Sequence, residues 1–141
     1  MRALTVKQPW AWAIIDAGKD IENRTWHTSY RGSLAIHAGS SATRTYHAWA
    51  QGWMAAIGVE APELEDLPLG CVIGTVELVD CVRGSGSRWA MPDCWHWVLR
   101  KPQSCKPQFA RGALGLWMLD DGARAGRDGT SFATDQPGSV D

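Results

Sequence analysis

The order of hydrophobic and polar residues predicts a strand followed by a short buried helix at the start of the chain. Residues 4–6 are apolar at every second position, which is typical of a strand with one buried face. Residues 10–17 are apolar nearly all round, so the helix predicted there should be buried. Pro9 suits its first turn, and Gly18 suits the left-handed position at its C-terminal end.

Two alternating segments follow this helix. Residues 19–26 predict a strand that carries three side chains on one face, Glu22, Arg24 and Trp26. Residues 33–38 predict another strand, with aliphatic side chains inward and His37 on the opposite face.

A second helix is predicted over residues 42–57, with Ser41 as its N-cap and Gly58 at its end. Its apolar positions recur three or four residues apart, so we expect one face to pack on the sheet. That apolar stripe consists of Tyr46, Trp49, Ala50, Trp53 and Ile57. The acidic, proline-containing residues 60–69 predict a loop.

Residues 70–82 give the strongest strand pattern in the chain, apolar on both faces, and predict a central strand. Residues 94–99 and 112–119 predict two more strands, joined by a connection over residues 101–109, which contain two prolines. Strands that follow one another without regular βαβ alternation argue against a parallel doubly wound sheet. The predicted fold is α+β: a small mixed barrel of five to six strands, one short buried helix and one amphipathic helix.

Charge and composition divide the chain into a domain and a tail. Residues 1–119 form the predicted domain, whereas residues 120–141 are rich in Gly and Asp and predict a flexible acidic extension. The whole chain has 14 basic and 15 acidic residues. Removing the two bases and five acids of the tail leaves 12 basic and 10 acidic residues, a net charge of +2. A locally basic surface is therefore compatible with the domain.

Several features point to a reduced, cytoplasmic protein that is not in a membrane. There is no apolar run of about 18 residues and no long apolar segment near the N-terminus of the kind found in secretory signals. The four cysteines are sparse for this length, and we expect free thiols. Cys94, His96 and Cys105 match no common zinc spacing, so we expect neither a metal nor a cofactor.

Three charges between apolar elements are the main candidates for function: Lys19, Glu22 and Arg24. In one interpretation they form a solvated edge strand with an internal ion pair. In the other they are held beside the buried helix and Trp26, partly desolvated, where two cations can grip a phosphate and the carboxylate can orient them or act as a base.

These residues also carry a resemblance to a known family. The segments Lys7–Ala11, Lys19-x-x-Glu22-x-Arg24 with Trp26, and Tyr30–Ala38 resemble the ASCH domain (the activating-signal-cointegrator homology domain), whose motif is G-x-K-x-x-E-x-R. Ala17 stands at the first glycine of that motif, and Gly18 fills the variable place. Residues 67–81 and 112–117 are similar to the family's later strands, so the resemblance spans about residues 4–119.

The resemblance implies a PUA-like barrel with a cleft beside the Lys-x-x-Glu-x-Arg strand that binds RNA or a nucleotide. The alternative is a hydrolase in the same cleft, either a ribonuclease or an N4-acetylcytidine amidohydrolase, with Lys19 as acid–base group and Glu22 as its partner. Some small relatives deacylate N4-acetylcytidine with a Lys, a Thr and a Glu. Lys19 matches that lysine, but Glu22 stands where those relatives carry the threonine, so the hydroxyl is missing.

Several further positions each allow two interpretations. His37 is a structural histidine or contacts a base. Glu77, in the apolar central strand, is paired with a cation or catalytic, and we favour the pairing. Arg31 contacts phosphate or solvates a turn. Trp26, Trp95 and Trp97 are core residues or stack on bases, and Trp26 is the best candidate for stacking because it shares a face with Glu22 and Arg24.

The sequence therefore predicts a monomer whose partner is RNA or a modified nucleotide, with DNA as a further option. The expected ligand-binding residues are Lys7, Trp10, Lys19, Glu22, Arg24, Trp26, Arg31 and His37. A protein–protein adaptor ranks last.

Overall fold

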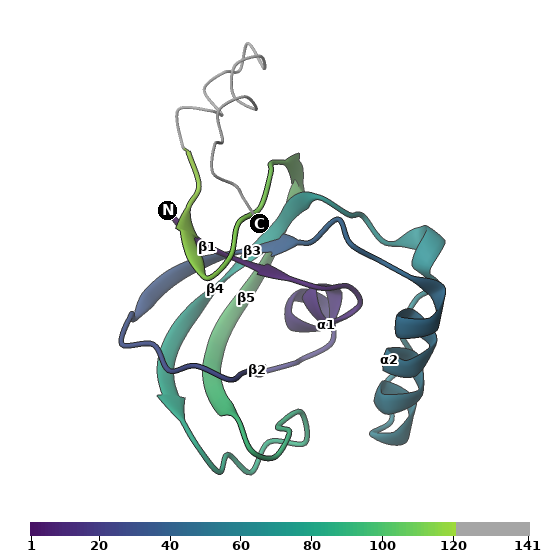
Figure 1. The fold of residues 1–141 in the computed structure, drawn as a ribbon, viewed down its shortest axis with the longest axis horizontal. Helices are drawn as coiled ribbons and strands as arrows, with labels where there is room; N and C mark the ends of the chain where they lie inside the picture. Colours follow the sequence, from purple (N-terminus) through teal and green to yellow (C-terminus); the bar gives the residue numbers. More distant parts are fainter. Residues whose placement is uncertain (121–141) are drawn as a thin grey trace.

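Six strands form one strongly curved sheet in a computed structural model that describes residues 1–120 (Figure 1). The elements in chain order are β1 (Arg2–Val6), α1 (Trp10–Asp16), β2 (Ile21–Arg24), β3 (Gly32–Ala38), α2 (Arg44–Ala56), the 3-10 helix η1 (Leu64–Asp66), β4 (Cys71–Val82), β5 (Trp95–Phe109) and β6 (Leu116–Met118). The six-stranded sheet curls into a half-barrel and, with the short buried helix and the second helix, confirms the predicted α+β barrel-like fold. The tail predicted for residues 120–141 lies, from residue 121 on, outside the described residues.

The strand order is β2-β5-β4-β3-β1-β6, which makes β4 a central strand as predicted. β1 and β3 are parallel, and all other neighbours are antiparallel. β2 is shorter than predicted and pairs only with residues 95–98 of β5. Residues 25 and 26 therefore lie just beyond the C-terminal end of β2.

The connection predicted over residues 101–109 is wrong, because β5 runs through it to Phe109. β5 pairs with β4 along this stretch, but β2 covers its other side only as far as Val98. Pro102 and Pro107 are tolerated there because a strand with one free edge does not need every N–H group for pairing. The pairing is irregular, with register shifts in β4 and a left-handed backbone at Lys101 (φ 56°).

α1 occupies the concave side of the sheet, between β1 and β2 (Figure 1). Five of its seven residues are buried, which agrees with a sequence that is apolar nearly all round. Gly18 takes the predicted left-handed conformation after the helix, at φ 76°. The chain therefore turns directly from the buried helix into Lys19 and β2.

α2 lies apart from the sheet, beside α1 (Figure 1), so the expectation that it packs on the sheet is wrong. Its contact with α1 runs through Trp10, whose ring meets those of Trp49 and Trp53 at centroid distances of 6.0 and 5.4 Å. The fully buried positions of α2 are His47, Ala50 and Met54. Of the predicted stripe, Ala50 is buried, Tyr46, Trp53 and Ile57 are partly buried against the core, and only Trp49 is exposed. Its N-cap is Thr43, not Ser41, and the Thr43 hydroxyl accepts from the Tyr46 backbone N–H.

No helix among residues 1–120 is long and apolar enough to cross a membrane.

Gly74 determines how closely α1 approaches the irregular part of β4. A methyl group at this position would lie 2.4 Å from the Gln103 carbonyl oxygen and 2.8 Å from Ile15 Cδ1. Both neighbours are constrained, one by the β5 backbone and the other by packing in the core.

Gly74→Ala should therefore lower the free energy of unfolding by about 2 kcal/mol, because the added methyl overlaps both the β5 backbone and the Ile15 side chain of α1. Gly86→Ala is the matched control, since nothing lies within 4 Å of its added methyl. Urea denaturation of both variants measures the difference. Equal stabilities would show that β5 and α1 do not approach Gly74 this closely.

Candidate functional site

A cleft of about 500 Å³ lies where the end of β1, the start of α1, β2 and α2 meet. Its lining is basic and aromatic, with one buried acid. The charged residues are Lys7, Lys19, Glu22 and Arg24, and the aromatic ones are Trp10, Trp26, Tyr46 and Trp49. Six of the eight predicted ligand-binding residues are thus brought together here.

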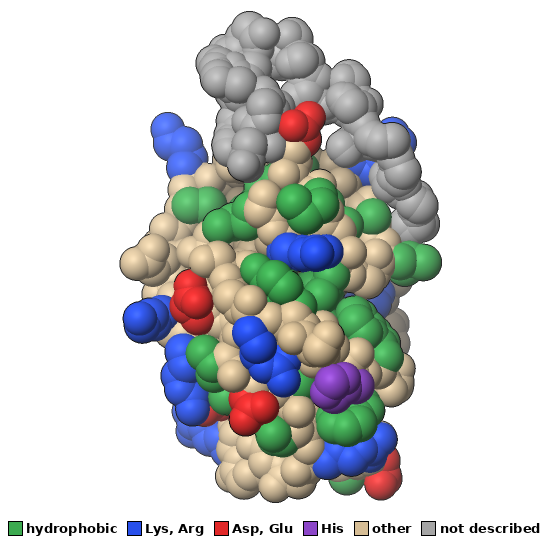
Figure 2. Space-filling view, turned by 90° about the vertical axis from the view of Figure 1, so that its left-hand side faces the viewer, with side chains coloured by type: hydrophobic (Ala, Val, Ile, Leu, Met, Phe, Trp, Pro, Cys, Tyr) green, Lys and Arg blue, Asp and Glu red, His purple; other side chains and the backbone are tan. Residues whose placement is uncertain are grey.

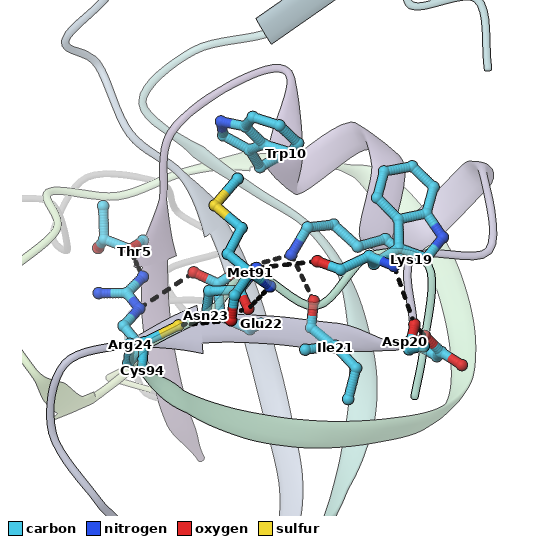
Figure 3. A network of polar contacts seen from close by, with 12 residues as sticks. Thr5, Trp10, Lys19, Asp20, Ile21, Glu22, Asn23, Arg24, Met91 and Cys94 are labelled. Carbon is cyan, nitrogen blue, oxygen red and sulfur yellow. Dashed lines mark hydrogen bonds and ion pairs between the residues drawn. The ribbon is translucent and has the colours of Figure 1, made fainter. Parts of the chain in front are cut away.

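The Glu22 carboxylate lies at the centre of the site and binds a cation with each oxygen (Figure 3). Oε1 accepts from Lys19 Nζ at 3.0 Å, and Oε2 accepts from Arg24 Nε at 3.0 Å. Lys19 is 3% exposed and Glu22 is 6% exposed. β2 is thus an edge strand with an internal ion pair, as one interpretation of the sequence had it, but the pair is not solvated, because the carboxylate and the ammonium are both buried.

Lys19 and Arg24 differ in how many of their N–H groups remain available to a ligand. Lys19 also donates to the Ile21 carbonyl oxygen, so the protein engages its ammonium twice. Arg24 reaches across to β1, where Nη2 donates to the Thr5 carbonyl at 2.8 Å (Figure 3). Arg24 Nη1 has no hydrogen-bond partner among the described residues, which leaves one face of the guanidinium for a ligand.

The pKa of Glu22 is lowered by its surroundings. Burial alone would raise it, but the positive charges of Lys19 and Arg24 and the hydrogen bonds from both more than offset burial. The carboxylate is therefore ionised at neutral pH, as an ion-pair partner of two cations must be.

An aromatic wall faces these charges. Trp10 Nε1 donates to the Tyr46 hydroxyl at 2.8 Å, which ties α1 to α2. Trp49 is 51% exposed and Trp26 is 36% exposed, the latter packed edge-on against Trp97 at 4.7 Å. Lys7 Nζ lies 5.1 Å from the centre of the Tyr46 ring. Exposed indole surface inside a basic cleft is suited to stacking with a planar ligand.

Two predicted residues lie elsewhere. Arg31 uses its guanidinium to bind the Thr28 and Tyr30 carbonyl oxygens and lies 3.6 Å from Asp80, so it stabilises its own turn. His37 is buried and lines a neighbouring cavity, with both ring nitrogens bonded inside the protein, to Thr5 Oγ1 and to the Ala110 carbonyl.

Local contacts also fix the roles of the remaining candidate residues. Trp97 is fully buried and Trp95 packs against His27, so neither lines the cleft. Glu77 accepts from the Ser33 hydroxyl at 2.9 Å, and no cation within residues 1–120 forms the ion pair with it that we favoured. The thiol of Cys94 and the ring of His96 bind the Met91 carbonyl. Residues 1–120 contain no group of three His, Cys, Asp or Glu side chains that could hold a metal ion.

Sequence reasoning missed the residues that α2 and the loop before β5 contribute. The helical pattern predicts that Tyr46 and Trp49 pack on the sheet, whereas both line the cleft and Trp49 is half exposed. Asn23 binds the loop, donating to the Trp89 carbonyl at 3.0 Å and accepting from the Met91 N–H at 2.9 Å. These bonds place Met91 at the cleft, and no local pattern predicted them.

Glu22→Gln should lower the free energy of unfolding at pH 7 by about 3 kcal/mol, because it leaves a buried ammonium without its counter-charge. Because the folded-state pKa of Glu22 is depressed, its stabilising contribution is complete above the ordinary value of 4.5 and is lost as the pH falls through the lowered pKa. The variant should therefore lose less stability than the wild type on acidification below pH 4.5.

Urea denaturation at pH 7 and below pH 4.5 measures both effects. Glu65→Gln is the control, because Glu65 forms an exposed pair with Arg44 and should matter little. The account of the site fails if Glu22→Gln and Glu65→Gln behave alike.

Comparison with known proteins places this site in a family. Residues 4–101 match the ASCH domain. The chain is 30% identical to activating signal cointegrator 1 of Homo sapiens and 29% identical to that of Mus musculus, over 134 aligned residues and 83% of this chain in each case. It spans only 22% of the length of either relative.

A crystal structure of a mutant of ZmASCH from Zymomonas mobilis is also similar, at 17% identity and a TM-score of 0.47, covering 77% of this chain and 74% of that one. The ASCH match covers well over half of the chain and includes the whole Lys19-x-x-Glu22-x-Arg24 segment. The protein therefore belongs to the ASCH domain family.

Proposed function

We propose that this protein is a binding module for RNA or a nucleotide, with the ligand held in the cleft beside β2. The observation that carries this proposal is that one cavity combines cationic side chains with partly exposed indole rings. Phosphate groups and bases need these two kinds of partner together.

The charges of the cleft favour an anionic ligand. Three cations and one acid line it, and that acid is already shared between Lys19 and Arg24. Lys7 is exposed and makes no ion pair among the described residues, so its charge is available, together with the outer face of Arg24. A planar guanidinium whose position is already fixed loses little entropy on binding phosphate.

The chain as a whole is not basic. On the face of the molecule in Figure 2, basic, acidic and apolar side chains are interspersed, with no broad field of one sign. The net charge of the whole chain is −1. A ligand would therefore be recognised by the cleft itself, through a few phosphate contacts and stacking on Trp26 or Trp49, and RNA metabolism is the setting we propose.

Hydrolysis in the same cleft is the alternative raised by the buried Lys19–Glu22 pair. The contacts favour binding, because the ammonium is held by a carboxylate and a carbonyl. Glu22 also stands at the position where the acetylcytidine-deacylating relatives carry a threonine, and Glu77 lies outside the cleft.

The binding proposal predicts that single-stranded RNA binds more weakly as salt is raised, because phosphate contacts release counterions. Lys7→Ala should weaken binding about threefold to tenfold and reduce the slope of log affinity against log salt by about 0.7. Fluorescence anisotropy over a salt series measures both quantities.

A control at Lys106 and a pair of variants at Trp26 make this test specific. Lys106→Ala removes an exposed lysine outside the cleft and should leave binding unchanged. Trp26→Ala should weaken binding about tenfold through lost stacking, whereas Trp26→Phe should retain most of it. The proposal is wrong if wild-type protein does not bind RNA at low salt, or if Lys7→Ala and Lys106→Ala are equivalent.

A separate experiment distinguishes binding from catalysis. Incubation of the protein with RNA and with N4-acetylcytidine, followed by mass spectrometry, should reveal no product. Product that forms with the wild type and disappears with Lys19→Met would instead establish the hydrolase.

A further inference from the structure

A second cavity, of about 780 Å³, adjoins the cleft. The two share three lining residues, Thr5, Lys7 and Arg24. The far walls of the second cavity come from the turn after β3, at residues 39–41, and from the segment between β5 and β6, at residues 110–115. Lys7 and Arg24 therefore stand between two hollows and can contact a ligand that occupies both.

The second cavity is more strongly positive than the first. Lys7, Arg24 and Arg111 line it, and no Asp or Glu does. Ser40 and Ser41 add exposed hydroxyl groups. The Arg111 side chain is exposed and has no hydrogen-bond or ion-pair partner within residues 1–120. Arg24 is shared with Glu22, but Lys7 and Arg111 have no ion-pair partner among the described residues, and two such cations with two hydroxyls match the needs of a phosphate group.

The backbone on both sides of Arg111 is fixed to the sheet. The Ala110 N–H donates to the Gly70 carbonyl at 3.2 Å, and the Ala110 carbonyl accepts from His37 Nε2 at 2.7 Å. Gly112 is pressed against β1 and β3, since a methyl group there would lie 2.5 Å from Thr5 Oγ1 and 2.8 Å from His37 Cε1. Arg111 thus projects from an anchored segment.

Thr5 connects the two hollows. Its carbonyl accepts from Arg24 Nη2 at 2.8 Å, which fixes the guanidinium of the cleft. Its hydroxyl accepts from Trp117 Nε1 at 3.0 Å and is therefore free to donate to His37 Nδ1 at 3.1 Å. His37 then carries its proton on Nε2, and this N–H donates a hydrogen bond to the carbonyl oxygen of Ala110, the residue before Arg111. Burial lowers the pKa of His37, and the Ala110 bond only partly offsets this, which agrees with a neutral ring.

We infer that the ligand is a nucleic-acid strand of at least two nucleotides, with one nucleotide in the cleft and the adjoining phosphodiester in the second cavity beside Arg111. This inference rests on the proposed function and specifies its substrate class. Leu114 lines the second cavity and is 80% exposed, so it offers an apolar surface to the next sugar or base. A free nucleoside would leave this second cavity empty.

The test compares ligands of increasing length on the full chain at fixed salt. The probes are a nucleoside monophosphate, the corresponding nucleoside triphosphate, and tetranucleotides of RNA and of DNA. We expect a tetranucleotide to bind at least tenfold more tightly than the monophosphate and more tightly than the triphosphate. Arg111→Ala should weaken tetranucleotide binding about tenfold, lower its salt slope by about 0.7, and leave the monophosphate unaffected.

Arg83→Ala is the matched control, because Arg83 is an exposed arginine that lines neither hollow, and it should change nothing. The inference is overturned if the monophosphate or the triphosphate binds as tightly as the tetranucleotides. It is also overturned if Arg111→Ala does not selectively weaken binding of the tetranucleotides. In both cases nucleotides still bind, so the proposed function stands. Absence of binding by every probe would overturn both. The RNA and DNA arms show which strand is preferred.

Discussion

The site depends on one buried carboxylate that is shared by two cations. Glu22 is out of water, and only the contacts with Lys19 and Arg24, each at 3.0 Å, make its ionised form tolerable there. Those contacts in turn require the chain to leave α1 through the left-handed Gly18 and to enter β2 along the end of β5. A change in either element would leave a charge buried without a partner.

The carboxylate also divides the positive charges between structural and ligand-facing roles. Lys19 is engaged by Glu22 and by the Ile21 carbonyl, so its main effect is on the architecture of the cleft. Arg24 is held on one side and open on the other, and Lys7 is unpaired among the described residues. The three charges of the family motif therefore have two roles: Lys19 and Glu22 form a structural pair, and Arg24 is a guanidinium held in position for a ligand. This division favours recognition of an anion over proton transfer by Lys19.

The sequence was sufficient to predict features that depend on local pattern. Alternation placed Glu22 and Arg24 on one face of a strand, and apolar residues all round indicated that α1 is buried. What could not be predicted depends on distant partners. β5 continues through two prolines because β4 supports one side while the other side is free. Trp49 is exposed because of where α2 lies in space, and Arg31 lies outside the cleft because of where the turn after β2 lies. Arg111 belongs to no periodic segment, and only the bonds from Ala110 to Gly70 and His37 bring it to the second cavity.

The nine tryptophans offer the most direct test of the central claim, that the cleft beside β2 is the binding site. Each indole N–H gives its own signal in a nitrogen–proton correlation spectrum, and single Trp→Phe variants assign them. Titration with single-stranded RNA should shift the signals of Trp10, Trp26 and Trp49, which line the cleft, and leave those of Trp12 and Trp95 in place. Shifts at Trp12 or Trp95 with no change at the three cleft tryptophans would contradict the account.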